Sequence, residues 1–373
     1  MSAVLEVQGL YVLFGNAETV QMQRTVRGVT LDPAVEVTIV QPPGYRIGLA
    51  NVAFTVNAGD CLAVLGRSGW GKSSLLRTLA GLQPAGNGRV VVKGQDVSAR
   101  QPEKRNVVYL HQEPVLFPHL SVLDNVAFPM TIRGVDRQVS ARRAIDLLAR
   151  LQVAETRGNF PHALSGGQRH RVALARALSA EPAVLLLDEP LSSLDPEVRR
   201  DVRASLQELR DASGAAMILV THDLDDALVV ASHIAVIGPF ADLSEPLSPE
   251  RMLDKPPHAD AARLLGVFTE LAGEIREDGH FHWLGCRIPA ESMPEGRAVA
   301  FVRPHELRVE RVTGVNVSSL VVTGRRDTAH DVSLTGRAEG GETVSVRTAS
   351  GSDVQVGDSF VVHIDRARFF PAH

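Results

Sequence analysis

Cysteine is scarce in this sequence. Its 373 residues include only Cys61 and Cys286, which stand far apart and lack the spacing of paired metal ligands. Thiols of this number and spacing are typical of reduced, structural cysteines in a cytosolic protein. We therefore expect reduced thiols and no cysteine metal site.

Charge of one sign is scarce as well. The chain has 39 lysine and arginine residues against 43 aspartate and glutamate residues, which gives a formal net charge of −4 at pH 7. This near balance argues against a protein that binds nucleic acid or another polyanion through bulk charge. The composition is still compatible with a basic surface on one face of the protein.

Long apolar runs are missing too. The longest ones, such as "AVLLL", have the length of a strand and fall well short of the roughly 18 residues that indicate a membrane-spanning helix. The N-terminal "MSAVLEVQGL" lacks the basic region followed by an apolar region that marks a secretory signal. We expect a chain that carries no such signal and does not cross a membrane by itself.

The length suits two domains, and the pattern of the sequence divides accordingly. From about residue 50 to 240, short β-rich apolar runs alternate with helical patterns, which predicts a largely parallel sheet with crossover helices. The expected strands cover 61–66, 106–111, 183–188 and 216–222. An amphipathic helix is expected over 140–155, with an apolar face of Ala144, Ile145, Leu148 and Leu151.

The sequence changes character after residue 240. Residues 241–269 are rich in proline and polar side chains, as a linker would be. From 270 to 373, short alternating runs such as "ETVSVRT" and "SFVVHI" are separated by glycine-containing turns, which predicts a small β-domain. A further segment, 16–47, interrupts two strand-like runs, and its sequence indicates no function.

A glycine-rich loop, "GRSGWGKS" over 66–73, follows an apolar run and precedes the helical "SSLLRTLAGL". Its glycines let successive backbone N–H groups turn inward around an anion, and the N-terminus of the helix adds partial positive charge. In this pattern the lysine faces the β- and γ-phosphates of a nucleotide, and the serine hydroxyl holds Mg²⁺. The predicted nucleotide site consists of Gly66, Gly69, Gly71, Lys72, Ser73 and Ser74.

Two adjacent carboxylates, Asp188 and Glu189, follow the strand-like run in "AVLLLDEP". Two acids in that place are a poor structural choice unless a cation neutralises them. Asp188 at the end of the strand can bind Mg²⁺ through the water molecules of the metal, and Glu189 can polarise the water that attacks a phosphate. We predict a metal ligand in Asp188 and a catalytic base in Glu189.

Gln112 and His222 also follow strand-like runs, "NVVYLH" and "AMILVT". The carboxyl ends of parallel strands converge on one ligand crevice, so both side chains are expected near the acidic pair. Because "DLDDAL" follows His222 directly, we predict that this histidine senses the γ-phosphate.

The order of these motifs resembles the ATP-binding-cassette (ABC) ATPases. "LSGGQ" over 164–168 is the signature of that family, and the other parts of its cassette occur in order, with "SSLD" over 192–195 between the acidic pair and His222. The resemblance covers about residues 1–240. It implies an α/β P-loop NTPase fold with a helical subdomain at about 113–180, and ATP and Mg²⁺ as cofactors.

The resemblance also implies roles for single residues. Phe14 would stack on adenine, although a core position suits it nearly as well. Gln112 would be both a metal ligand and a catalytic residue, and Asp195 would belong to the loop through which two sites communicate. The signature residues that would contact nucleotide are Ser165, Gly166, Gly167 and Gln168.

A shared site follows from the way cassettes of this family pair. They associate head to tail, and the resemblance implies that Ser165 and Gly167 would contact the γ-phosphate held by the partner's Lys72. Ser165 also suits the N-cap of a helix over "GGQRHRVALARAL". Two chains would thus share each ATP, and hydrolysis would release them.

The segment "EPVLFPHLSVLDNVAFPM" over 113–130 resembles the part of the cassette that docks a cytoplasmic helix of a membrane subunit. Phe117 and Leu120 are predicted to line that groove. Val115, Leu116 and Val122 are expected in the core of the helical subdomain.

The C-terminal "AVAFVRPHELRVE" over 298–310 resembles a segment of the small β-barrel regulatory domain, of the OB or TOBE type, attached to many bacterial importer ATPases. It implies a regulatory domain over 270–373. Exporters usually fuse the cassette to transmembrane helices, and the sequence shows none. The resemblance thus implies the ATP-hydrolysing subunit of a bacterial solute importer, bound peripherally at the cytoplasmic face of the inner or plasma membrane.

An importer of this kind implies particular partners. The chain would pair with a second copy of itself or a paralogous cassette, bind separate integral membrane permease subunits, and work indirectly with a periplasmic or lipid-anchored solute-binding protein, without nucleic acid. "FVRPHEL" resembles the sulfate-type importers, and "EPVLFPHLSV" the molybdate and ferric-iron ones. An inorganic oxyanion such as sulfate or molybdate is the expected cargo, with ferric iron, polyamines and other organic solutes as alternatives.

Two other classes of protein compete with the importer. A soluble non-transport ABC ATPase would act on ribosomes or DNA, but such proteins carry two cassettes in one chain or a long coiled coil, and neither pattern occurs here. A cassette that only binds nucleotide would not need the catalytic residues Glu189 and His222.

Overall fold

The computed structural model describes residues 3–14, 24–25, 38–39, 46–192, 194–238, 241–284, 286–290, 293–312, 320–327, 331–338, 343–349 and 353–372. The chain divides into two compact units, Met1–Met252 and Leu253–His373, and each is described by itself. The segment 16–47 lies outside the described residues apart from its last two positions and the short paired strands β2 (Arg24–Thr25) and β3 (Thr38–Ile39).

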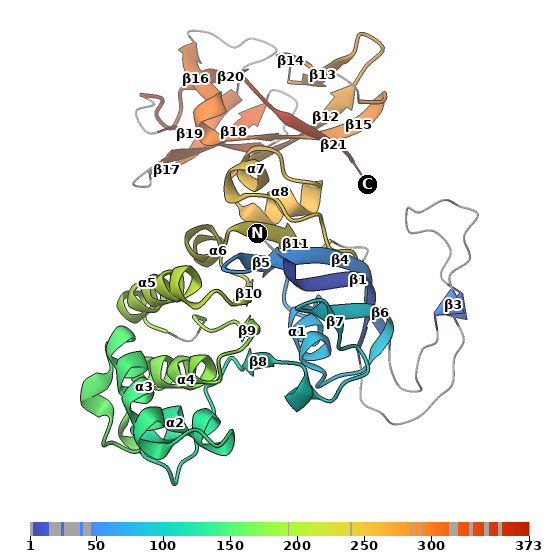
Figure 1. Ribbon diagram of the computed structural model, residues 1–373. Helices are drawn as coiled ribbons and strands as arrows, with labels where there is room; N and C mark the ends of the chain where they lie inside the picture. Colours follow the sequence, from blue (N-terminus) through green and yellow to red (C-terminus); the bar gives the residue numbers. More distant parts are fainter. Residues whose placement is uncertain are drawn as a thin grey trace. The chain divides into compact units, whose positions relative to one another are not determined.

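The first unit contains a five-stranded parallel sheet with the order β11-β5-β10-β9-β8 (Figure 1). Its strands are β5 (Cys61–Leu65), β8 (Val107–Leu110), β9 (Val184–Asp188), β10 (Ala216–Thr221) and β11 (His233–Val236). The four strands expected from the sequence are confirmed, each within a residue or so of its predicted bounds. In register, Val220 pairs with Asp188 and Thr221 pairs with Leu65, so the carboxyl ends of β5, β9 and β10 finish at one edge.

A second, antiparallel sheet with the order β4-β1-β6-β7 was not anticipated. It consists of β1 (Ala3–Phe14), β4 (Arg46–Asn57), β6 (Ala85–Val92) and β7 (Gln95–Asp96). Helix α1 (Lys72–Ala80) contributes the buried Leu75, Leu76 and Leu79 to a core that also includes side chains of both sheets. Burial of this apolar face fixes α1, which begins directly after the glycine-rich loop.

Arg105 holds the other end of α1. Its guanidinium is 6% exposed and donates to the backbone oxygens of Thr78 and Leu79, and also to those of Ser98 and Arg100. A cation at a helix C-terminus satisfies carbonyls that have no partner within the helix. The loop residues at the start of α1 are therefore carried by a helix that is secured at its end.

The helices α2 (Val122–Ile132), α3 (Arg137–Arg150) and α4 (Gly166–Ser179) pack against one another and form the helical part of the unit (Figure 1). The helix predicted over 140–155 is present as α3, but it begins and ends earlier in the chain. Asp136 caps its start, and its end comes early because Gln152 has a left-handed φ of 55°. Ala144, Leu148 and Leu151 are buried as predicted, but the prediction for Ile145 was wrong, since that side chain is 38% exposed. Ile145 follows Ala144 by about 100° around the helix and so points away from the buried face.

The loop between β8 and α2 is organised by Asn125. This buried side chain accepts from the Phe117 N–H and donates to the backbone oxygens of Phe117 and Leu120. Leu116 and Val122 are buried, as predicted, and the side chains of Phe117 and Leu120 are half-buried. The core position predicted for Val115 was wrong, because its side chain is 66% exposed. Leu116, the next residue, takes the buried place instead.

The first unit also contains α5 (Pro196–Ser213) and α6 (Leu224–Val230), with 3₁₀ turns at Pro102–Lys104, Ala154–Thr156 and Pro161–Ala163. Helix α7 (Pro249–Asp254) follows, and α8 (Ala259–Leu265) belongs to the second unit. The segment expected as a linker, 241–269, thus contains α7 and α8. The boundary between the two units falls inside α7.

The second unit consists of two five-stranded sheets with the orders β14-β13-β12-β15-β21 and β16-β20-β17-β18-β19, all pairs antiparallel. The large side chains Phe281 and Phe360 are fully buried in its core. The strands are β12 (Thr269–Ile275), β13 (His280–Trp283), β14 (Cys286–Pro289), β15 (Gly296–Val302), β16 (Leu307–Val312), β17 (Leu320–Asp327), β18 (Asp331–Ala338), β19 (Thr343–Ala349), β20 (Ser359–Ile364) and β21 (Arg368–Pro371), with a 3₁₀ turn at Pro304–Glu306.

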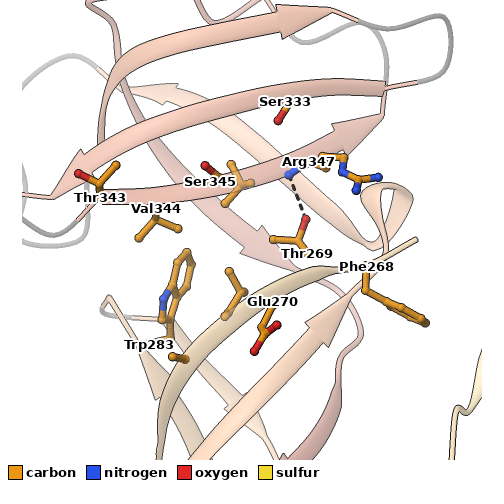
Figure 2. A pocket seen from close by; sticks show the side chains of 12 residues that line it. Phe268, Thr269, Glu270, Trp283, Ser333, Thr343, Val344, Ser345 and Arg347 are labelled. Carbon is orange, nitrogen blue, oxygen red and sulfur yellow. Dashed lines mark hydrogen bonds between the residues drawn. The ribbon is translucent and has the colours of Figure 1, made fainter. Parts of the chain in front are cut away.

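A cavity of about 440 Å³ lies between β12 and the edge strand β19 of this second unit (Figure 2). The Arg347 N–H donates to the Thr269 hydroxyl across it at 3.0 Å. Glu270 at its rim accepts two hydrogen bonds from Arg263, and the Arg347 guanidinium donates to the Gly266 oxygen. The charged side chains that line the cavity therefore already have partners within the protein.

Candidate active site

The glycine-rich loop connects β5 to α1 at the sheet edge described above. Gly69 and Gly71 have φ values of 82° and 98°, in the left-handed region that favours glycine. Gly71 is also the N-cap of α1 and supplies no side-chain acceptor to the first turn. The backbone N–H groups at this helix start therefore stay available to an anion, as the sequence motif predicts.

Lys72 is the first residue of α1, and only 5% of its side chain is exposed. Its Nζ donates to the backbone oxygens of Gly66 at 2.8 Å and Arg67 at 3.2 Å, and it lies 3.9 Å from Glu189 Oε1. Burial lowers the pKa of the Lys72 ammonium, and the carboxylates of Glu189 and Asp188 oppose that shift. The cation is thus held inside the loop by neutral carbonyls, which a phosphate could replace.

Asp188 receives a separate donor on each carboxylate oxygen. The Ser73 hydroxyl donates to Oδ1 at 2.9 Å, and the Tyr109 hydroxyl donates to Oδ2 at 2.6 Å. Asp188 is 5% exposed, and burial together with the neighbouring Asp188 carboxylate raises the pKa of Tyr109 to about 12. A carboxylate and a hydroxyl side by side are the oxygen ligands that Mg²⁺ prefers, so the residues present fit that ion.

Glu189 and His222 form the open side of the site. The two side chains meet at 3.1 Å between Nδ1 and Oε2, with 53% of the His222 side chain and 19% of the Glu189 side chain exposed. Glu189 has a left-handed φ of 45°, and its N–H donates to the Val220 oxygen of β10 at 3.0 Å. A non-glycine residue in this conformation carries strain of about 1–3 kcal/mol, which the surrounding structure must hold in place.

Gln112 is tied to the same strand end through Ser192. Its Nε2 donates to the Ser192 hydroxyl at 3.1 Å, and that hydroxyl donates to the backbone oxygen of Glu189 at 3.0 Å. The buried side chain of His170, in α4, contacts two backbone oxygens, that of Gln112 at 3.2 Å through Nε2 and that of Gly166 at 3.0 Å through Nδ1. The histidine thus connects the Gln112 loop to the start of α4.

Ser165 caps α4, as predicted from the sequence. Its hydroxyl accepts from the Gln168 N–H at 3.2 Å, and the Gln168 side chain accepts from the Ser165 N–H at 3.1 Å, which makes a reciprocal capping box. Gly166 is exposed, whereas a Cβ on Gly167 would lie 2.4 Å from the Val198 side chain. Within the part of the chain that the structure describes, no hydrogen bond or ion pair connects 165–168 to the phosphate loop.

The remaining predicted site residues are placed as follows. Ser74 lies in the first turn of α1, and its backbone oxygen accepts from the Thr78 hydroxyl. Asp195 is exposed at the N-cap of α5 and makes no side-chain cap bond. The Phe14 side chain lies outside the described residues. Tyr109 and His170 were not predicted as site residues. The signal that could have identified them is a polar group within an otherwise apolar strand or helix pattern.

None of the helices in the described ranges is long and apolar enough to span a membrane. The predicted site residues lie on the first unit. The phosphate loop, Gln112, the acidic pair and His222 lie at or just after the carboxyl ends of its parallel strands, in the position expected for a ligand crevice.

Comparisons with known proteins agree with this geometry. Residues 49–192 match the family model described as "ABC transporter". The sulfate/thiosulfate import ATP-binding protein CysA of Brucella melitensis is 38% identical over 285 residues, which cover 74% of this chain and 79% of that protein. CysA of Caulobacter vibrioides is 38% identical over 271 residues, with 72% and 79% covered.

A solved structure shares the fold. The dimeric structure of a post-hydrolysis state of the ATP-binding cassette MJ0796 bound to ADP and Pi matches with a TM-score of 0.53 at 22% identity, over 66% of this chain and 98% of that one. The expected P-loop fold of the α/β class, followed by an all-β unit, is confirmed. At the identity and coverage found for the curated relatives, the chain belongs to the import ATP-binding proteins of the ABC transporter family.

Proposed function

We propose that this chain binds and hydrolyses ATP at two sites shared between paired cassettes, and that this cycle drives solute uptake through separate membrane permease subunits. The observation that carries the proposal is a pair of contact sets at a single sheet edge. One set joins Lys72, Glu189 and His222, and the other joins Ser73 and Asp188, the residues next to them in the chain.

Binding of the nucleotide is assigned to the loop and Lys72. The loop N–H groups face the phosphates, and the Lys72 ammonium exchanges its carbonyl partners for the β- and γ-phosphate oxygens. Ser73 and Asp188 are the residues that would hold Mg²⁺, which neutralises the charge of the phosphates when it is bound. The Gln112 side chain is linked through the Ser192 hydroxyl to the backbone oxygen of Glu189, and Gln112 would assist Ser73 and Asp188 at the metal site.

Activation of water is assigned to Glu189. Its Oε2 is held by His222, and its Oε1 lies on the side of Lys72, so the carboxylate is fixed between the two nitrogen groups. In this position Glu189 would orient a water molecule and accept its proton, while His222 reports the γ-phosphate. The exposure of His222 leaves the water access that hydrolysis requires.

The second half of each site would come from a partner cassette. Ser165 and Gly166 present a capped helix N-terminus to solvent, and the described residues of the same chain do not connect it to the phosphate loop. Such a terminus favours an anion. We assign it to the γ-phosphate held by the partner's Lys72, with the partner being a second copy of this chain or a paralogous cassette.

The shared site is tested with mixed dimers that cannot hydrolyse ATP. All chains carry Glu189→Gln; one chain adds Lys72→Ala and the other adds Ser165→Arg. Each variant alone should fail to trap ATP. The mixture should trap one labelled ATP per heterodimer after rapid gel filtration, because one of its two sites combines an intact Lys72 with an intact Ser165.

A matched control uses Ser121→Arg in place of Ser165→Arg. Ser121 is also an N-cap serine, of α2, and loses a comparable cap of about 1 kcal/mol. Chains with this change and an intact Lys72 should still trap ATP by themselves. If the variants fold and exchange partners, yet the mixture traps no more ATP than either chain alone, sharing through the signature helix is wrong for this protein.

The second unit is proposed to be a regulatory domain that the chemistry does not need. A fragment that ends at Met252 should hydrolyse ATP, because all the site residues precede the division between the units. A fragment that ends at Glu245 should be less stable, because it lacks Leu247, which exchanges two backbone hydrogen bonds with Ile234 of β11 at 2.7 and 2.9 Å. Thermal melts and ATP turnover of both fragments measure this difference. A 1–252 fragment that folds but does not bind ATP would contradict the assignment.

The transport partners and the cargo are proposals from the relatives. Their names refer to sulfate and thiosulfate import, and we propose an inorganic oxyanion of the sulfate type for this chain as well. The protein would work at the cytoplasmic face of the membrane, on permease subunits served by a solute-binding protein. Labelled sulfate uptake by cells with and without the intact gene tests the cargo, with molybdate, ferric iron and polyamines as competitors. Purification with ribosomes instead of permease subunits would favour the non-transport class.

A further inference from the structure

We propose that Tyr109 is a positioning residue for Asp188, and that its hydroxyl group determines how strongly Mg²⁺ and ATP bind together. The inference depends on the proposed function, because it takes Ser73 and Asp188 as the residues that hold Mg²⁺. Tyr109 would act through Asp188 and would not itself contact the metal or the nucleotide.

The geometry of two neighbouring strands brings Tyr109 to this carboxylate. Strand β8 runs parallel to β9, and Tyr109 pairs in register with Leu186, two residues before Asp188. Side chains alternate along a strand, so Leu186 and Asp188 project from the same face of β9. The tyrosine ring spans this step along the strand, and its hydroxyl reaches Asp188 Oδ2 at 2.6 Å.

The tyrosine ring is itself held in place. It packs against the core of the first unit and makes an edge contact with His111, with 4.4 Å between the ring centroids. The phenol oxygen therefore has little freedom to leave the carboxylate. A rigid aromatic donor of this kind fixes the rotation of the acid it contacts, which a flexible side chain would do less well.

The two donors to Asp188 differ in what they are needed for. The Ser73 hydroxyl is the predicted Mg²⁺ ligand, and its bond to Oδ1 marks the oxygen that faces the metal site. The Tyr109 hydroxyl is not a predicted metal ligand, and its other neighbour is the Arg77 side chain. Within the described residues these are the two hydrogen bonds to the Asp188 side chain, so Tyr109 is the donor that still holds Asp188 when Ser73 serves the metal.

Loss of the Tyr109 hydroxyl would leave Oδ2 buried without a donor. The carboxylate could then rotate, and Oδ1 would no longer be kept on the side of Ser73. Residues that orient a metal-binding group in this way typically change metal affinity by about 10- to 100-fold when they are removed. The aromatic ring alone would still fill the core, so Tyr109→Phe removes only the hydroxyl, with its hydrogen bond to Asp188 and its interaction with Arg77.

The test measures equilibrium binding and needs no turnover. In a Glu189→Gln background, labelled ATP is bound at increasing Mg²⁺ and, separately, in EDTA. Tyr109→Phe should raise the Mg²⁺ concentration for half-maximal binding by about 10- to 100-fold. The Kd for ATP in EDTA should stay within about twofold of the parent, because the phosphate loop and Lys72 are untouched. Tyr11→Phe, in β1, is the matched control and should leave both values unchanged.

A double-mutant cycle shows whether the effect passes through Asp188. With Asp188→Asn already present, Tyr109→Phe should weaken the Mg²⁺ dependence no further. Equal losses of ATP binding in Mg²⁺ and in EDTA would mean that Tyr109 only supports the fold, and would overturn the inference. So would an unchanged Mg²⁺ requirement in folded Tyr109→Phe protein. If the parent itself bound ATP without any response to Mg²⁺, the proposed function would fail along with the inference, so the two failures can be told apart.

Discussion

Lys72→Ala is expected to abolish ATP turnover and to weaken ATP binding by about 30- to 5,000-fold, which corresponds to roughly 2–5 kcal/mol. The variant removes the one ammonium group that lies inside the phosphate loop, where it is 5% exposed and bonded to the Gly66 and Arg67 oxygens. An anion bound there would be left without its buried cation. Equilibrium binding of labelled ATP and a phosphate-release assay measure the two effects.

Lys104→Ala is the matched control for this prediction. Lys104 is an exposed lysine at the end of the 3₁₀ turn Pro102–Lys104, so the same charge is removed outside the loop. Its binding and turnover should match those of the parent. If Lys72→Ala binds ATP as tightly as the parent does, the loop is not the phosphate site.

Glu189→Gln should have a different outcome: ATP binding is retained, but hydrolysis falls by about 10²–10⁴-fold. The amide keeps the size of the side chain but cannot accept the proton of the attacking water. Binding should persist because Lys72, Ser73 and Asp188 are unchanged. Single-turnover assays measure the loss, and gel filtration with ATP should show a persistent dimer.

Glu181→Gln provides the control for the acidic residue. Glu181 also has a left-handed backbone, with a φ of 46°, but it lies on the surface and pairs with Arg143. Its turnover should be normal. Normal turnover in Glu189→Gln as well would remove Glu189 from the role of catalytic base.

Much of the site could be predicted from the sequence because its groups lie in short continuous motifs. The phosphate loop and the Asp188–Glu189 pair each combine residue type with a local strand or helix pattern, and the parallel register then brings them to one edge. The structure joins these groups by contacts, while their catalytic roles stay predictions. Features that depend on a short local motif could therefore be predicted from the sequence.

The rest depends on contacts between distant segments. The antiparallel sheet pairs β1 with β4 across the segment 16–47, and no periodicity in either strand specifies its partner. The sequence places Tyr109 in an apolar strand and shows no partner for its hydroxyl. The hydrogen bond to Asp188 forms only because β9 lies beside β8 in the sheet. Val115 and Ile145 were misplaced for a similar reason, since which side of a loop or helix faces the interior is set by the surrounding structure.

Glu189 has a left-handed backbone, so the stability of the fold and the chemistry of the site favour different residues at this position. Glycine would occupy a φ of 45° without strain, and the change would relax this strand end. Glycine has no carboxylate, however, so the residue that suits the backbone best would leave His222 and the water without their acid. The fold therefore keeps a conformationally unfavourable residue at its reaction centre. In variants selected only for thermostability, replacement of Glu189 should be among the first changes.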